Sequence, residues 1–202
     1  EYLDPLDNLN EYNSFKINTF IPDGSHVYTE EMQHSVLVDW VIAALMKIKP
    51  LPILLFNGTK SSGKTLTSKA LMKLFMGDSS NVSIFPNDKR SLMSCITSHF
   101  IYTIDNLDSK TPPWFNDTLT LASTGGELSE RALFSNSTTY KKEIVTSVII
   151  TSRNAYFAKR DDIKDRILPI FFENRTDYSI QEDQLLLDIT KNRNKILTKL
   201  FF

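Results

Sequence analysis

A glycine-rich segment constrains this chain more than any other feature. Residues 58–65 read GTKSSGKT, which satisfies the pattern GxxxxGK[ST]. The apolar run before it, residues 51–56, predicts a buried strand, and residues 66–76 after it predict a helix. Between a strand and a helix, such a loop points backbone N–H groups and the positive end of the helix dipole at a phosphate group. The chain is therefore expected to bind ATP or GTP.

Each position of this loop has an expected task. Lys64 is expected to reach the β- and γ-phosphates, and the Thr65 hydroxyl to bind Mg²⁺. The residues expected to bind the nucleotide are Gly58, Thr59, Lys60, Ser61, Ser62, Gly63, Lys64, Thr65 and Leu66. The alternative is a chance glycine turn before a helix, which leaves the matching flanks unexplained.

Composition narrows the class of protein further. A length of 202 residues predicts one domain of ordinary size, with or without a small appendage, and 41% hydrophobic residues suffice for a core. With 23 basic against 24 acidic side chains, no global field attracts nucleic acid, so any DNA contact must be a local patch. The single Cys95 excludes an intramolecular disulfide framework and fits a reducing compartment. No apolar run reaches the length of a membrane span.

Helical and strand patterns alternate along residues 30–151, which predicts a parallel sheet between layers of helices. Trp40 lies on the apolar stripe of the first helix and is interpreted as core. The predicted helices are residues 29–48, 66–76, 89–98, 113–123 and 180–200, and the predicted strands are residues 51–56, 81–86, 99–106 and 145–151.

Three segments are expected. They are an irregular N-terminal arm or linker (residues 1–28), the main core (residues 29–175) and a C-terminal helical segment (residues 176–202). Because the chain starts at Glu1 and stops on an apolar LFF, we expect it to be cut from a longer protein.

An acidic residue follows the strand IYTI. Asp105 matches the second nucleotide motif, in which an Asp after a buried strand supports the Mg²⁺ bound by the loop threonine. The alternative role is a cap on the next turn. Asn106 stands where many ATPases carry a Glu base, and an amide orients water but accepts its proton poorly. The sequence leaves the base open among three further acids, Asp108, Glu127 and Glu130.

Two later segments complete the candidate catalytic set. The strand pattern in VTSVIITSRN ends in polar groups, so Thr151 and Asn154 are candidates for contact with the γ-phosphate or the attacking water, or else simple polar caps. Arg166 precedes the apolar run ILPIFF, and an arginine here can project onto the γ-phosphate of a neighbouring subunit. Its alternative role is local pairing with Asp162 or Asp165.

Four elements follow one another in the chain: the glycine loop, Asp105, the polar strand end at residues 151–154, and Arg166. In this order they resemble the AAA+ ATPases over about residues 30–175. The resemblance implies an α/β fold, a three-layer αβα sandwich with a central parallel sheet, with ATP and Mg²⁺ as cofactors. Residues 128–144 contain two strand-like runs around a polar turn, which predict a β-hairpin at about residues 130–144. The hairpin stands just before the strand predicted at residues 145–151. A hairpin in this place resembles that of the superfamily 3 viral helicases and the MCM helicases.

Three sequence segments also resemble the replication proteins of phages, plasmids and genomic islands: IDNLD, LASTGGELSERALFSN and DRILPIFF. In those proteins an Asp-Asn second motif is normal. This resemblance implies a catalytic set of Lys64, Asp105, Asn106, Asn154 and Arg166, with Mg²⁺ held by Thr65 and Asp105. In such helicases the hairpin contacts DNA inside a hexameric ring, which makes Lys141 and Lys142 the candidate DNA contacts. The alternative for this lysine pair is an exposed, solvated face.

The implied function is the ATP-hydrolysing motor of a DNA replication helicase. Its expected partners are single-stranded or forked DNA, further copies of the chain in a hexamer, and other replication proteins, and no membrane is involved. Its expected location is the bacterial cytoplasm, or the interior of the host cell for a viral protein. The alternative is a helicase loader or assembly switch with slow ATP turnover, which the missing Glu after Asp105 favours.

Overall fold

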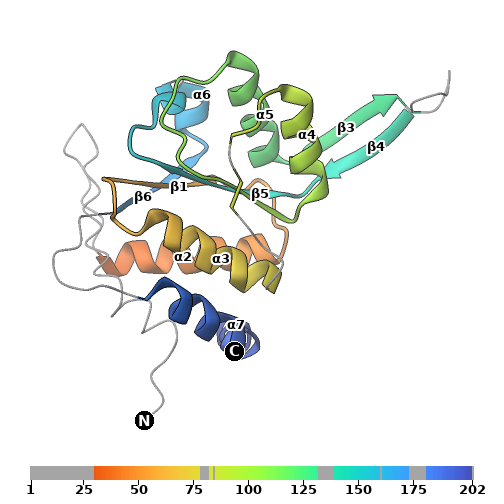
Figure 1. Cartoon of the computed structure of the whole chain (residues 1–202). Helices are drawn as coiled ribbons and strands as arrows, with labels where there is room; N and C mark the ends of the chain where they lie inside the picture. The colour runs from red at the N-terminus through yellow and green to blue at the C-terminus, as the bar shows by residue number, and fades with distance from the viewer. Residues whose placement is uncertain are drawn as a thin grey trace, which may run out of the picture.

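A four-stranded parallel sheet lies at the centre of the molecule (Figure 1). The computed structural model describes residues 30–77, 82–83, 85–131, 139–159, 161–172 and 181–201. The strand order is β2-β5-β1-β6. The strands are β1 (Ile53–Gly58), β2 (Ile101–Ile104), β5 (Ser147–Ser152) and β6 (Ile167–Phe172). Sheets of this kind are covered on both faces, which explains why their strands are almost continuously apolar.

Successive residues of β1 point into two separate cores. Leu54 and Phe56 join the cluster on the face covered by α2 (Glu30–Leu45) and α3 (Lys64–Met76). Ile53 and Leu55 join the cluster on the opposite face. That face is covered by α4 (Lys89–Ser98), α5 (Pro113–Thr124) and the short α6 (Asp161–Lys164), with the 3₁₀ turn η2 (Tyr156–Lys159) beside them. The predicted α/β sandwich with a parallel sheet is confirmed.

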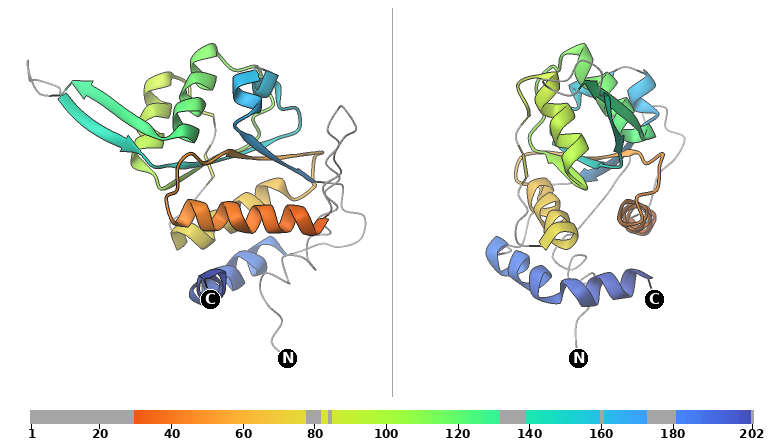
Figure 2. Two further views of the ribbon diagram at one scale, coloured as in Figure 1. Left: turned by 180° about the vertical axis from the view of Figure 1, so that it is seen from behind. Right: turned by 90° about the vertical axis from the view of Figure 1, so that its right-hand side faces the viewer.

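The C-terminal helix α7 (Glu182–Phe201) lies outside the α2 and α3 layer rather than against the sheet (Figure 2). Arg193 of α7 donates from Nε to the carbonyl of Leu74 (2.7 Å) and from Nη2 to that of Phe75 (2.9 Å), so it caps the last turn of α3. An exposed ion pair joins Lys69 to Glu182 (2.6 Å). The predicted C-terminal helical segment is therefore docked on the helix that begins with the glycine loop.

Several predicted elements have different boundaries in the structure. The first helix ends at Leu45 rather than near residue 48. Of the predicted strand at residues 81–86, the described part shows only a single parallel bridge from Ser83 to Ile104. Trp40 is buried, as predicted, and its indole N–H donates to the carbonyl of Pro52. The predicted arm at residues 1–28 lies outside the described residues. Within the part of the chain described, no helix is both long and apolar enough to span a membrane.

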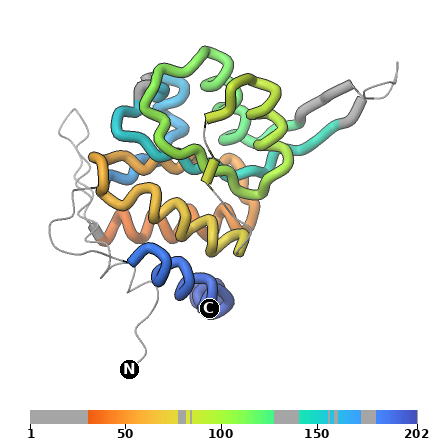
Figure 3. Tube along the Cα trace, in the orientation of Figure 1, coloured from red at the N-terminus to blue at the C-terminus, as the bar shows by residue number. Residues whose placement is uncertain are grey.

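A two-stranded antiparallel hairpin projects from the body of the molecule (Figures 1 and 3). It consists of β3 (Gly126–Arg131) and β4 (Thr139–Ile144), so it starts earlier than the predicted residue 130. The connection between the strands, residues 132–138, lies outside the described residues. The hairpin leaves the body where β5 begins, which is the end of the sheet opposite the glycine loop.

Lys49 fastens the root of this hairpin. Its Nζ atom donates to the carbonyls of Ala122 (2.5 Å), in the last turn of α5, and Thr146 (2.7 Å), between β4 and β5. Gly125, with φ of 72°, is needed here because a Cβ atom would lie 3.0 Å from the Lys49 side chain. Burial lowers the pKa of Lys49 to about 8. One partly buried amine therefore joins both chain segments that lead into the hairpin.

We predict a pH-dependent stability difference between the wild type and Lys49→Met. Between the folded pKa of about 8 and the ordinary value of 10.5, the unfolded chain binds more protons at Lys49 than the folded chain. The free energy of unfolding of the wild type should therefore rise relative to Lys49→Met as the pH is raised from 7.5 to 9.5. Urea unfolding of both proteins at the two pH values measures this difference. A constant or falling difference contradicts the burial of this amine.

Candidate nucleotide-binding site

The glycine loop closes one edge of the sheet, where the carboxyl ends of β1, β2 and β5 meet. Gly63 caps α3 with φ of 94°. A Cβ atom on Gly58 would lie 2.3 Å from the carbonyl oxygen of Phe172, so β6 leaves space only for glycine. The first N–H groups of α3 have no partner inside the helix, as in any helix, and so are available to a phosphate. The local geometry is that expected from the motif.

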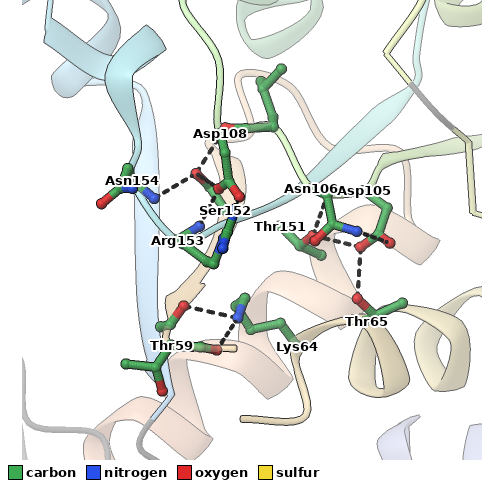
Figure 4. A network of polar contacts seen from close by, with 12 residues as sticks. Thr59, Lys64, Thr65, Asp105, Asn106, Asp108, Thr151, Ser152, Arg153 and Asn154 are labelled. Atoms are coloured by element: carbon green, nitrogen blue, oxygen red, sulfur yellow. Dashed lines mark hydrogen bonds and ion pairs between the residues drawn. The ribbon is translucent and has the colours of Figure 1, made fainter. Parts of the chain in front are cut away.

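Lys64 is buried inside its own loop (Figure 4). Its Nζ atom donates to the carbonyls of Gly58 (2.8 Å) and Thr59 (2.5 Å) and lies 3.3 Å from the Ser62 hydroxyl. Ser62 in turn donates to the Thr59 carbonyl (2.9 Å). Burial is the main cause that lowers the pKa of Lys64. The lysine charge is thus held at the centre of the loop, where the bound phosphates are expected.

The other loop positions differ in exposure. Lys60 and Ser61 are exposed, and Ser61 has φ of 64°. Leu66 is half-buried and packs against the core between the sheet and α2 and α3. Leu66 can therefore offer a nucleotide only its backbone groups, whereas Lys60 and Ser61 carry exposed polar side chains.

Asp105 joins three elements of the site. Its Oδ1 atom accepts hydrogen bonds from Thr65 of α3 (2.9 Å) and from Thr151 of β5 (2.5 Å). Thr151 is fully buried, and its hydroxyl also accepts the backbone N–H of Asn106 (2.8 Å). Of the two roles left open for Thr151, these contacts favour the polar cap over contact with the γ-phosphate, because the hydroxyl is already bonded to Asp105 and Asn106. Thr151 orients the carboxylate instead.

The donor set fits Mg²⁺. A hydroxyl and a carboxylate lie side by side at Thr65 and Asp105, and Mg²⁺ prefers oxygen ligands of this kind, completed by phosphate and water. Among the described residues, no cluster of three or more His, Cys, Asp or Glu side chains is arranged to hold a metal alone. Any Mg²⁺ here would therefore depend on the nucleotide for further ligands.

Asn106 has a left-handed backbone, with φ of 56°, which an asparagine tolerates better than most residues. Its amide donates from Nδ2 to the second oxygen of Asp105 (3.0 Å), and the side chain is exposed at the site. Asn154 is also exposed, two residues after β5 ends, and its backbone N–H donates to Ser152 (3.1 Å). Both amides stand at the edge of the sheet that carries Lys64.

The three alternative bases do not suit that task. Burial opposes ionisation of Asp108, but hydrogen bonds from Arg153 and Ser152 outweigh it, and the pKa of Asp108 is lowered. A carboxylate with a lowered pKa and two partners is a poor proton acceptor. Glu127 and Glu130 lie on β3, which leaves the sheet at the end opposite the glycine loop. Glu127 and Glu130 therefore cannot act as the base in the nucleotide site of their own chain. The order of residues along the sequence does not show at which end of the sheet each of them lies.

Arg166 also lies at the far end of the sheet. It directly precedes β6, and its carbonyl accepts the N–H of Ile53, the first residue of β1. Its Nε atom is buried and has no hydrogen-bond partner among the described residues. That nitrogen therefore takes no part in the alternative role, local pairing with Asp162 or Asp165. Arg166 and Lys64 stand at opposite ends of one sheet.

The candidate DNA contacts lie in the middle of β4. Lys141 and Lys142 pair in register with Ser129 and Leu128, between the root and the undescribed tip. Both lysines are exposed, and Lys141 forms an ion pair with Glu127 across the hairpin (2.6 Å). That partner raises the pKa of Lys141. Lys142 is the next residue of β4, and its side chain is exposed.

A family model describing a replication protein of actinomycete integrative conjugative elements matches residues 25–201. The chain belongs to this family. It is therefore a replication protein of a mobile element, which confirms the predicted resemblance at that level. Among curated proteins, no relative matches the chain at a significant level.

Solved structures support the fold. The C-terminal region of NrS-1 in its apo A form matches 99% of this chain and 45% of its own, with 17% identity and a TM-score of 0.64. A second structure of that region matches 85% of this chain and 42% of its own, with 15% identity and a TM-score of 0.58. The JCV helicase matches 85% of this chain and 46% of its own, with 11% identity and a TM-score of 0.51. The chain thus spans less than half the length of these structures and shares their fold over that part.

Thr151→Val should destabilise the protein more than Thr65→Val. The first substitution removes a fully buried hydroxyl that bonds a carboxylate and a backbone N–H, at an expected cost of about 1.5–3 kcal/mol. The second removes a half-buried hydroxyl and leaves Asp105 bonded to Thr151, so about 1 kcal/mol or less is expected. Urea unfolding at pH 7 measures both values. Equal losses would mean that Thr151 does not orient Asp105.

Proposed function

We propose that this chain is the ATP-hydrolysing motor domain of a replicative DNA helicase that works as a ring in the cytoplasm. The observation that carries the proposal is the separation of Lys64 and Arg166 at opposite ends of one sheet. The six residues of β1 span about 20 Å, so Arg166 does not reach the phosphates bound by its own chain. A neighbouring subunit is the natural source of the missing arginine.

Each residue of the nucleotide site has a separate proposed role. The loop N–H groups and Lys64 bind the phosphates, and Thr65 and Asp105 hold Mg²⁺ beside them. When bound, Mg²⁺ would neutralise charge on the β- and γ-phosphates. Thr151 keeps Asp105 in place. Asn106 and Asn154 orient the attacking water through their amides, without accepting its proton.

Arg166 is suited to act on a neighbour's nucleotide. A guanidinium is always charged and presents a planar fork of donors that matches phosphate oxygens. A site completed in this way requires an oligomer, and a hexamer is the form proposed here.

The hairpin is the proposed contact with single-stranded or forked DNA. It projects from the body, and its exposed Lys141 and Lys142, adjacent on β4 and so on opposite faces of the hairpin, each offer a cation for a phosphate, with Lys141 also paired to Glu127. Both chain segments that enter the hairpin are fastened to the core through Lys49. Movement of the core relative to a neighbour would therefore carry the hairpin with it.

A second candidate, a helicase loader or assembly switch with slow ATP turnover, is favoured by Asn106. Its amide is bonded to Asp105, and the described part of the site has no carboxylate in the position of a base. ATP-dependent strand displacement on a forked DNA separates the two candidates. Displacement by the protein alone supports the motor, whereas recruitment of a partner helicase without displacement supports the loader.

Mixing two inactive variants tests the shared site. Arg166→Ala should retain ATP binding but lose hydrolysis by about 10³-fold or more. Lys64→Ala should not bind ATP. A mixture should regain activity, because an intact Lys64 site of one subunit then faces the Arg166 of another. As a control, mixing Arg166→Ala with the double variant Lys64→Ala/Arg166→Ala should give no activity. Absence of rescue at every mixing ratio contradicts the assignment of Arg166 to a neighbour's site.

Salt dependence tests the lysine pair. If Lys141 and Lys142 both contact phosphates of single-stranded DNA, the double Ala variant should reduce the slope of log affinity against log salt concentration by about 1.4. Fluorescence anisotropy with a labelled oligonucleotide at several salt concentrations measures the slope. Lys191→Ala, which removes an exposed charge on α7, is the control and should leave it unchanged. An unchanged slope in the double variant would place both lysines outside the DNA interface.

A further inference from the structure

A second charged pair, Asp108 and Arg153, lies at the same edge of the sheet as Lys64 (Figure 4). Asp108 comes three residues after Asp105, and Arg153 directly follows β5. Asp108 accepts the Arg153 backbone N–H through Oδ1 (2.6 Å) and the Arg153 Nε through Oδ2 (2.5 Å). The buried Ser152 hydroxyl adds a longer contact to Oδ1 (3.2 Å) and donates to the Leu107 carbonyl (2.8 Å). The pair therefore ties the ends of β2 and β5 together.

The geometry leaves the outer part of the guanidinium unused. Asp108 engages the Nε atom of Arg153, and the two terminal nitrogens have no partner among the described residues. The Asp108 side chain is only 18% exposed, whereas that of Arg153 is 52% exposed. The carboxylate thus holds the inner edge of the guanidinium and leaves its outer fork of donors open to solvent. Such a fork matches the oxygens of a phosphate group.

Electrostatics connects this pair to the lysine of the loop. After burial, which lowers the pKa of Lys64, the next influences are Asp108, which raises it, and Arg153, which lowers it. Both charges therefore act on Lys64 in addition to that of Asp105. The link between the ends of β2 and β5 needs only the Asp108 carboxylate, the Arg153 backbone N–H and Ser152, and leaves the guanidinium fork without a task. Its place beside the phosphate-binding lysine needs a different explanation.

We propose that Arg153 binds the terminal phosphate of a nucleoside triphosphate held by its own chain, with Asp108 as the positioning residue that aims it. The inference rests on the proposed nucleotide-binding function and deepens it. Arg153 then makes the site prefer ATP to ADP before any neighbour takes part. Arg166, from the neighbour, serves hydrolysis. The two arginines thus separate recognition of the γ-phosphate from its transfer to water.

Nucleotide discrimination tests this role. Isothermal titration in the presence of Mg²⁺ compares a non-hydrolysable ATP analogue with ADP, for the wild type and Arg153→Ala. A charged hydrogen bond to the terminal phosphate predicts that Arg153→Ala lowers affinity for the analogue by about 10- to 100-fold, while affinity for ADP changes less than about twofold. Arg153→Lys keeps the charge but loses the fork and should fall between the two. Lys191→Ala is the charge-matched control and should bind both nucleotides as the wild type does.

The outcomes are separable. A wild type that binds neither nucleotide contradicts the proposed function and the inference with it. A wild type that binds both, together with an Arg153→Ala variant whose ratio of the two affinities is unchanged, overturns the inference alone. An equal fall in the affinities for both nucleotides also overturns the inference, because it is expected if Asp108 and Arg153 only stabilise the fold. Thermal unfolding of each variant checks that the fold persists. If Arg153→Ala does not fold, Arg153→Lys decides between the same outcomes.

Discussion

The hydrogen bonds to Asp105 are the constraint on which the rest of the site depends. One carboxylate oxygen receives the hydroxyls of Thr65 and Thr151, so α3, β2 and β5 meet at a single atom. Hydrogen bonds to a charged acceptor are stronger than neutral ones, and the burial of Thr151 protects one of them from water. The carboxylate is therefore already oriented toward the place where a metal and phosphates are proposed to bind. Preorganisation of this kind lowers the cost of binding.

Local patterns predicted the parts of the fold that depend on local physics. The glycine loop and its flanking strand and helix were recognisable because their spacing alone carries the mechanism. The strand that ends at Asp105 was recognisable for the same reason. In the described part of residues 81–86 only the bridge from Ser83 to Ile104 is seen, because an apolar run predicts extended chain and not how many partners it finds.

Contacts between residues far apart in the chain were beyond this kind of prediction. Thr151 lies 46 residues from Asp105, and Lys49 lies 97 residues from Thr146. No periodicity encodes such pairs, since they depend on which strands become neighbours. The same limit explains the wrong assignment of Glu127 as a candidate base. The ion pair of Asp108 and Arg153 is visible in the sequence only as two charged residues, one after each of two buried strands.

The two ends of the sheet carry different parts of the proposed motor. The phosphate loop, Asp105 and Arg153 are at one end, and Arg166 and the hairpin root are at the other. The most direct test of a nucleotide site shared between subunits is the mass of the assembly, measured by sedimentation velocity with and without a non-hydrolysable ATP analogue and Mg²⁺. A site shared between subunits predicts a closed hexamer that forms when the analogue binds. A monomer that binds the analogue at every protein concentration would contradict it.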